Sequence, residues 1–294
     1  MAMSYRGAKV LVTGADGFIG SHLMFEIRKK WPGRVIGLDS GRLDLLKPAS
    51  TGILSRCLDK RTTLITLATA RRGLDGDRLI RHEILMAEHL AVALRKKKIR
   101  KWVHFSTTSV YGDAGSNPSI TEETPIFPNT SYGIGKFAGE CLVRAAVEQN
   151  GTKWLCVRPT MVYGPGDHGG SYGPGRLINS TRNSGRVILF GDGTERRDFI
   201  YVGDLARIVV ALLLQDRNGV YNVGSGRGHS MRDVVNLLAG LTCSRIKIQC
   251  KARLRRKVDL KYNIGKLQSA LPGFRFTPLR AGIEQSVQHS CPLS

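Results

Sequence analysis

The chain has 294 residues, enough for one large α/β domain or for one domain with a smaller appendage. Apolar residues make up 41% of the chain, so a sizeable core is possible and wholesale disorder is disfavoured. Lysine and arginine number 45 against 23 acidic residues, and the resulting net charge of +22 should attract anionic ligands.

Some of the basic residues cluster in three runs, which lie at 28–30, 95–101 and 253–257. Such runs either bind nucleic acid or form solvated helix faces, together with a few arginines directed at a diphosphate-bearing substrate. No nucleic-acid-binding motif accompanies them, so we favour the second interpretation and do not expect nucleic acid as a partner.

Membrane and metal signals are weak throughout the sequence. No apolar run reaches 18 residues, and the first residues lead into a strand without a signal-peptide core. The six cysteines are scattered without CxxC or metal-ligand spacing. We therefore expect a cytoplasmic protein with reduced thiols, no membrane partner and no metal.

The first half alternates strand-like and helix-like segments. The expected strands are Lys9–Thr13, Arg34–Leu38, Thr63–Ala68, Trp102–Ser106 and Trp154–Val157. The expected helices are Ile19–Lys30, Ala49–Arg56, Arg81–Lys97 and Tyr132–Glu148. This rhythm predicts an α/β protein with a Rossmann-type, doubly wound parallel sheet.

The pattern changes after Pro159. Residues Val162–Gly175 are rich in glycine and proline and are expected to form a loop, and short helices and strands follow from Leu177 to Gly240. We expect a dinucleotide-binding Rossmann domain at 1–165. Residues 166–294 should form mainly a smaller, mixed α/β substrate lobe, with some segments returning to the Rossmann sheet.

A glycine pattern, GADGFIG, follows the first strand directly. Gly14 permits a tight turn, Gly17 lets backbone approach a pyrophosphate, and Gly20 allows close helix packing. With Phe18 and Ile19 they form the predicted phosphate cradle at the start of a helix.

Asp39 ends the second strand, where a carboxylate accepts hydrogen bonds from the adenosine ribose and favours NAD. Arg42 nearby could instead pair with a 2′-phosphate, which keeps NADP possible. Asp39 could also be an ordinary turn residue.

Tyr132 and Lys136 lie four residues apart in SYGIGK, one turn of helix and therefore on one face. A free phenol titrates near pH ~10, too high for a base at neutral pH. The lysine and a positive nicotinamide would lower the pKa of the phenol, so the pair can serve acid–base chemistry on an alcohol.

The glycine pattern and the Tyr132–Lys136 pair occur together with five further motifs, in a fixed order along nearly the whole chain. The further motifs are Leu67-Ala68, FSTTSVYG at 105–112, RPTMVYGP at 158–165, GDGTERRDFIYV at 191–202 and YNVGSG at 221–226. The series resembles the extended short-chain dehydrogenase/reductase family, and within it the NAD-dependent epimerase/dehydratase group that modifies nucleotide sugars.

The resemblance implies roles for individual residues. Thr107 falls at the catalytic Ser/Thr position, Lys136 would bind the nicotinamide ribose, and Leu67 and Ala68 would line the cofactor. Thr108 and Met161 fall at substrate-contacting positions, although Met161 replaces the usual asparagine. The arginines expected to bind the substrate diphosphate are Arg197 and either Arg253 or Arg255. Glu83 also departs from the family, which often has asparagine there.

The residues after Thr107 bear on the reaction. Family dehydratases carry an Asp-Glu pair there, and decarboxylases acting on UDP-glucuronate a glutamate at the second position, whereas this chain has Thr108-Ser109. We therefore expect 4-epimerisation of a UDP-hexose through a 4-keto intermediate. A nucleotide-sugar 4-ketoreductase using NADPH is the first alternative, and Asp44-Leu45 resembles the shorter layout of such reductases. A non-catalytic scaffold binding nucleic acid or a partner is the second alternative. The resemblance also implies a homodimer.

Overall fold

The computed structural model describes residues 7–70, 73–113, 119–168, 173–242, 245–253 and 256–288. Its contacts divide the chain into two compact units, neither of which is continuous in sequence. The first comprises residues 1–112, 125–158 and 206–221, and the second comprises 113–124, 159–205 and 222–294. In the described part of the chain, no helix combines the length and the apolar character that crossing a bilayer requires.

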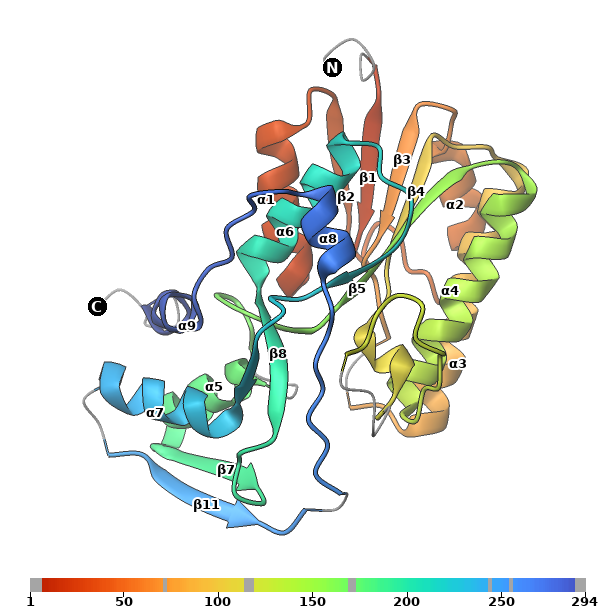
Figure 1. Cartoon of the computed structure of the whole chain (residues 1–294). Helices are drawn as coiled ribbons and strands as arrows, with labels where there is room; N and C mark the ends of the chain where they lie inside the picture. The colour runs from red at the N-terminus through yellow and green to blue at the C-terminus, as the bar shows by residue number, and fades with distance from the viewer. Residues whose placement is uncertain are drawn as a thin grey trace. The chain divides into compact units, whose positions relative to one another are not determined.

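The first unit is built on a six-stranded sheet with the strand order β2-β1-β3-β4-β5-β9 (Figure 1). The strands are β1 (Lys9–Thr13), β2 (Arg34–Leu38), β3 (Thr62–Thr66), β4 (Lys101–Phe105), β5 (Lys153–Pro159) and β9 (Gly219–Val223). Neighbours from β2 through β5 pair in parallel. The chain runs outward from β1 to β2 and then in the opposite direction through β3, β4 and β5, so the order reverses between β1 and β3. The Rossmann-type sheet predicted from the alternating pattern is confirmed.

Helices cover both faces of this sheet (Figure 1). They are α1 (Phe18–Lys30), α2 (Ala49–Cys57), α3 (Gly76–Lys96), α4 (Ser131–Gln149) and α6 (Val202–Leu214). On one face, α2, α3 and α4 share a core with the buried strand residues Leu11, Leu64 and Trp102. In Figure 1, α1 and α6 lie on the other side of the sheet. The 3-10 helix η2 (Thr108–Tyr111) follows β4 directly.

Helix α3 shows what the sequence pattern captured and what it missed. Its buried residues Glu83, Met86, Ala87 and Leu90 recur every three or four positions, which is the spacing of one helical face. The helix begins at Gly76, five residues before the predicted start at Arg81. Its first three residues, Gly76-Asp77-Arg78, carry no apolar side chain, but Leu79 and Ile80 continue the apolar spacing and the predicted start was therefore too late.

The second unit is a mixed α/β body with two small sheets. One is three-stranded in the order β10-β8-β6, from β6 (Met161–Tyr163), β8 (Arg196–Tyr201) and β10 (Gly228–Ser230). The other pairs β7 (Arg186–Phe190) with β11 (Lys247–Lys251) in parallel. The helices assigned to this unit are α5 (Pro174–Ser184), α7 (Met231–Thr242), α8 (Gly265–Ala270) and α9 (Leu279–Gln288). That this unit is a substrate lobe stays a prediction.

Two expectations are corrected. Residues Val162–Gly175 were expected to form a loop, but Val162 and Tyr163 belong to β6, which pairs with Ile200 and Tyr201 of β8, and Gly175 belongs to α5. A partner strand almost forty residues away gives no local signal. Residues 169–172 of the expected loop lie outside the described residues.

The basic run at 95–101 was expected to be solvated, but the side chain of Lys101 is fully buried. Its ammonium contacts Asp216 Oδ1 at 2.7 Å and donates a hydrogen bond to the carbonyl oxygen of Arg217 at 2.9 Å. A buried lysine is stable only with such partners, and these come from a segment more than 110 residues later.

Candidate active site

The carboxyl ends of β1 and β3 meet at the point where the strand order reverses, the usual ligand crevice of such sheets. Gly14, directly after β1, has a φ of +68°, and a Cβ there would lie 2.9 Å from the amide nitrogen of Ala68. The Leu67 amide donates to the carbonyl oxygen of Thr13 at 3.2 Å. The structure therefore brings Gly14, Leu67 and Ala68 together, and only glycine fits the first position.

The turn from β1 into α1 is equally close-packed. A Cβ on Gly20 would lie 2.0 Å from the carbonyl oxygen of Gly14, so the first turn of α1 rests on the preceding loop. Gly17 precedes the helix with an ordinary φ of −71°, and a Cβ there would lie only 3.3 Å from the carbonyl oxygen of Gly14, which is a tight contact. Phe18 and Ile19 open the helix. The first turn contains no acidic residue. Exposed backbone N–H groups with a positive helix end fit the diphosphate of a dinucleotide.

Asp39 and Arg42 interact with one another at the end of β2. Asp39 Oδ1 accepts a hydrogen bond from the Arg42 amide at 2.9 Å, and Arg42 Nε lies 3.8 Å from Asp39 Oδ2. The Arg42 side chain is 69% exposed and that of Asp39 40%, so both can still reach a ligand. The geometry therefore allows a carboxylate toward a ribose and a guanidinium toward a 2′-phosphate.

Glu83, noted as a departure from the family, ties the loop after β3 to α3. Its carboxylate is buried, and Oε1 accepts hydrogen bonds from the Thr69 hydroxyl and from the Ala70 amide, the latter at 2.8 Å. A Cβ on Gly135 of α4 would lie 3.0 Å from Glu83 Cβ. Glu83 thus contacts the loop that carries Ala68 and also the helix that carries Tyr132, a link that no local sequence pattern indicates.

Thr107 follows β4 and caps η2. Its Oγ1 accepts a hydrogen bond from the Ser109 amide at 3.1 Å and lies 3.2 Å from Ser109 Oγ. Thr107 and Thr108 are both buried, each with 7% of its surface exposed. This hydroxyl-rich turn carries no carboxylate.

Helix α4 places Tyr132 and Lys136 on one face next to that turn. Its cap is Thr130, whose hydroxyl accepts from the Gly133 amide at 3.0 Å. A Cβ on Gly133 would lie 2.6 Å from the carbonyl oxygen of Ser109, so the first turn of α4 packs directly on η2. Tyr132 is 39% exposed, whereas Lys136 is 3% exposed. The phenol can therefore meet a ligand, while the ammonium is held beneath the surface.

A buried ion pair anchors α4 to the sheet one turn after Lys136. Glu140 lies 2.6 Å from the Arg158 guanidinium of β5, and that guanidinium also donates to Tyr111 Oη at 2.9 Å. Nearby His104 is buried on β4, and burial, together with the charges of Lys136 and Arg158, holds its pKa well below the ordinary value. Burial and the neighbouring cations therefore favour the neutral form of this histidine.

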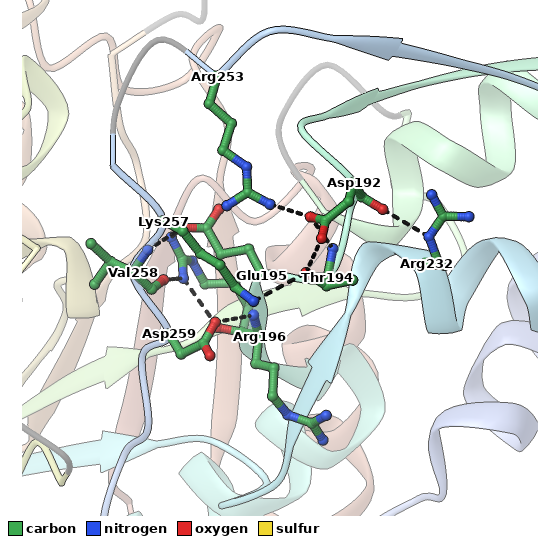
Figure 2. A network of polar contacts seen from close by, with 10 residues as sticks. Asp192, Thr194, Glu195, Arg196, Arg232, Arg253, Lys257, Val258 and Asp259 are labelled. Carbon is green, nitrogen blue, oxygen red and sulfur yellow. Dashed lines mark hydrogen bonds and ion pairs between the residues drawn. The ribbon is translucent and has the colours of Figure 1, made fainter.

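Two of the predicted phosphate ligands lie in the second unit and are paired with acids. Figure 2 shows the pair of Arg253 with Asp192. Arg197 contacts Glu195 Oε1 at 3.0 Å and donates to the carbonyl oxygen of Val258. Arg253 contacts Asp192, and a Cβ on Gly191 would collide with its guanidinium. These side chains are 18% and 21% exposed.

Met161 and Arg255 are the remaining candidates for substrate contacts. Met161 opens β6 and is half-buried, opposite Phe199 of β8. Arg255 lies outside the described residues.

The chain belongs to the NAD dependent epimerase/dehydratase family, whose sequence model matches residues 10–224. This confirms the family recognised from the ordered motifs, the enzyme class and the cofactor expected for it.

Individual relatives cover most of the chain. An uncharacterized UDP-glucose epimerase of Bacillus subtilis is 30% identical over 80% of this chain and 82% of its own. The UDP-glucose 4-epimerase of Mycolicibacterium smegmatis is 31% identical over 79% of this chain and 82% of its own. A dTDP-4-dehydro-6-deoxy-D-allose reductase of a Streptomyces species is 28% identical over 97% of this chain and 96% of its own.

A solved structure of a 4-epimerase is also similar to this chain. The UDP-glucuronic acid 4-epimerase of Bacillus cereus, in complex with UDP-glucuronic acid and NAD, superposes with a TM-score of 0.80. It is 26% identical, and the match covers 96% of this chain and 98% of that one.

Proposed function

We propose that the protein is an NAD-dependent 4-epimerase of a UDP-hexose. The observation that carries this proposal is the turn after β4, where Thr107 is followed by two hydroxyl residues and no carboxylate, packed against the helix of Tyr132 and Lys136. Elimination of water needs a further acid and base, whereas oxidation and re-reduction at one carbon need only one proton-transfer group and a hydride carrier. The UDP-glucose epimerases among the relatives support the same reaction.

In this proposal the Tyr132 phenolate accepts the proton of the sugar 4-hydroxyl, and Thr107 orients that hydroxyl. Bound NAD would take the hydride from C4 and return it. Lys136 binds the nicotinamide ribose and stabilises the phenolate by its charge. The 4-keto sugar rotates in the site so that the opposite face of C4 would receive the hydride, and Tyr132 returns the proton to the C4 oxygen.

The residues proposed to bind the cofactor surround the crevice at the carboxyl ends of β1 and β3. Gly14, Gly17 and Gly20, with the amides of Phe18 and Ile19, would hold the diphosphate, and Asp39 would bind the adenosine ribose. Leu67 and Ala68 would line the cofactor at the end of β3.

The residues proposed to bind the substrate are assigned from the family resemblance. Thr108 and Met161 would contact the sugar, and Arg197 with Arg253 or Arg255 would bind its diphosphate, because guanidinium forks suit phosphate oxygens. In the structure Glu195 and Asp192 hold the two described arginines in place by ion pairs.

The deciding experiment incubates the purified protein with UDP-glucose, UDP-galactose or UDP-glucuronic acid without added reductant. Proton NMR should show one sugar converting into its C4 epimer while absorbance at 340 nm stays constant. No conversion of any of the three would count against the proposal.

A nucleotide-sugar 4-ketoreductase is the second candidate. The reductase of the Streptomyces species aligns over nearly the whole chain, and the exposed Arg42 is suited to a 2′-phosphate. This reading requires stoichiometric consumption of NADPH with a 4-keto sugar, and it is excluded if the protein epimerises without net change in the cofactor.

We also propose a cytoplasmic homodimer that associates through α3 and α4. Leu85 on α3 and Ile134 on α4 are exposed apolar side chains, 36% and 40% accessible, which supports contact between copies along these helices. Light scattering of the purified protein tests the stoichiometry, and a monomer across the concentration range would contradict it.

A further inference from the structure

A cationic pocket lies at the amino ends of β3, β4 and β5, within the first unit. It has a volume of about 460 Å³. Its lining comes from the three loops that lead into these strands and consists of Lys60, Lys98, Ile99, Arg100, Gly151 and Lys153. The cofactor crevice is at the carboxyl ends of the strands, so this pocket is at the opposite edge of the same sheet.

Hydrogen bonds connect the three loops to one another. The Arg100 amide donates to the carbonyl oxygen of Thr62 at 2.9 Å, and the Ile99 amide donates to Thr152 Oγ1 at 3.3 Å. Gly151 has a φ of +68°, and a Cβ there would lie 3.3 Å from the ammonium of Lys98. The pocket wall is therefore fixed by backbone contacts, and glycine at 151 leaves room for the Lys98 ammonium.

The positive charge of the lining is only partly balanced. Lys153 contacts Asp216 Oδ2 at 2.5 Å, but Asp216 also serves the buried Lys101. Across the residues that the structure describes, neither Lys60 nor Lys98 has an ion pair or a hydrogen bond from its side chain. Arg100 lies over the Trp31 ring, with its guanidinium carbon 6.0 Å from the ring centroid.

Other negative groups nearby do not cancel this charge. Asp59 is next to Lys60 in sequence but pairs with Lys9 at 2.8 Å. Glu148 lines an adjoining pocket and contacts Arg144 at 2.8 Å. The helices α3 and α4 end at this edge, and each end contributes about half a negative charge, which together is less than the charge of the Lys60 and Lys98 ammonium groups.

We propose that this pocket is a second anion site, which binds a small polyphosphate. The recognised chemistry is a chain of two or three phosphate groups, as in inorganic triphosphate or in the tail of a nucleotide. One guanidinium and three ammonium groups around one cavity match several phosphate oxygens at once. Among the described residues, the lining of this pocket contains no aromatic side chain on which a base could stack, so a small anion fits it better than a nucleic acid strand.

The test is a calorimetric titration of the full chain with sodium triphosphate. Saturating NAD and UDP are present throughout, so that the diphosphate sites of the proposed enzyme are filled. The pocket variant is Lys60→Glu with Lys98→Glu. The control is Arg28→Glu with Lys29→Glu, which makes the same charge change in the last turn of α1, also at a helix C-terminus.

We expect saturable binding of one triphosphate per chain. The pocket variant should raise Kd at least about tenfold, because each lost charge-assisted contact is worth about that factor, and the control should change it less than about twofold. Gly151→Ala, which crowds Lys98 without altering the charge, should also raise Kd. Thermal melting of each variant checks that it is folded.

A second arm separates the two sources of the anion. ATP that displaces triphosphate and binds more tightly identifies a nucleotide, and ATP that binds equally or less tightly identifies the inorganic chain. The proposal is overturned by an absence of saturable binding, by equal losses in the pocket variant and the control, or by a single-stranded oligonucleotide that displaces triphosphate stoichiometrically. Sugar epimerisation is not part of the readout, so this result and the proposed enzyme activity can fail independently.

Discussion

Glu83 joins the loop after β3, helix α3 and helix α4 of the first unit. Its carboxylate accepts hydrogen bonds from the loop after β3, and its Cβ and Cγ lie beneath Gly135 of α4. Because buried carboxylates need their partners, this residue can hold the cofactor loop in a fixed position relative to α3.

Glu83→Ala should weaken both stability and cofactor binding. Without the acceptor, the Ala70 amide loses its bond, at a cost of about 1–3 kcal/mol in the free energy of unfolding. Glu83→Gln is the matched control, since its amide oxygen can still accept both bonds. Urea unfolding and NAD titration measure the two effects. Alanine and glutamine variants that behave alike would show that the carboxylate oxygen does not hold the loop.

Tyr132→Phe isolates the phenol oxygen. If Tyr132 transfers the proton, kcat should fall about 10²–10⁴-fold, while the Kd values for NAD and UDP stay near those of the wild type, because the aromatic ring remains. Initial rates and binding titrations on the same preparation measure both. A kcat within a few-fold of the wild type would remove Tyr132 from the chemistry.

At the scale of the element, α4 shows why a motif can be read from sequence while its support cannot. The four-residue spacing of Tyr132 and Lys136 is local, so helical periodicity alone places them on one face. The anchor beneath them joins Glu140 to Arg158 on a neighbouring strand. The partner of Lys101 comes from even further along the chain. Such pairs depend on which segments the fold brings together, and neither composition nor spacing encodes that locally.

The first turn of α4 depends on a glycine. Gly133→Ala would push a Cβ to 2.6 Å from the carbonyl oxygen of Ser109, so the helix must shift away from η2. We expect a loss of about 1–3 kcal/mol and a lower kcat, since Tyr132 moves with the turn. The control is Gly52→Ala in α2, where the nearest atom is 3.8 Å away and alanine should stabilise by about 0.5–1 kcal/mol. A Gly133→Ala protein with wild-type stability and kcat would contradict this packing.

Asp216 links the segment before β9 to the starts of β4 and β5. Burial alone would raise the pKa of its carboxyl group, but hydrogen bonds from Lys101 and Lys153 outweigh it and lower the pKa below 3.8. A carboxyl group whose pKa is lower in the folded state contributes stability above its unfolded pKa and loses it as the pH falls through the folded value.

Asp216→Asn should therefore destabilise the protein at pH 7 by about 1–3 kcal/mol, because the buried Lys101 loses its charged partner. The difference from the wild type should shrink as the pH falls below the unfolded pKa of about 3.9, and it should vanish once the pH passes the lowered pKa of the folded carboxyl. Urea unfolding at several pH values measures it. Glu284→Gln, in the exposed pair with Arg280, should cost less than about 1 kcal/mol. A penalty for Asp216→Asn that is the same at pH 3 and pH 7 would rule out the charge as its cause.

At the scale of the whole molecule, the net charge of +22 affects the stability of the folded chain. Some of the cations have defined partners, such as Lys101, Arg158 and Arg197. The surplus must lie at the surface, where like charges repel one another and favour the expanded chain.

Stability should therefore increase with ionic strength. The Debye length falls from about 20 Å at about 20 mM salt to about 4 Å at about 500 mM, so repulsion between surface cations is largely screened and Tm at pH 7.5 should rise by several degrees. The control is the same series near pH 10.2, the isoelectric point, where the net charge vanishes and the rise should disappear. Differential scanning calorimetry measures both series. A Tm that falls with added chloride at pH 7.5 would mean that attractive pairs, such as Lys9–Asp59, outweigh the repulsion and that the surplus charge does not limit stability.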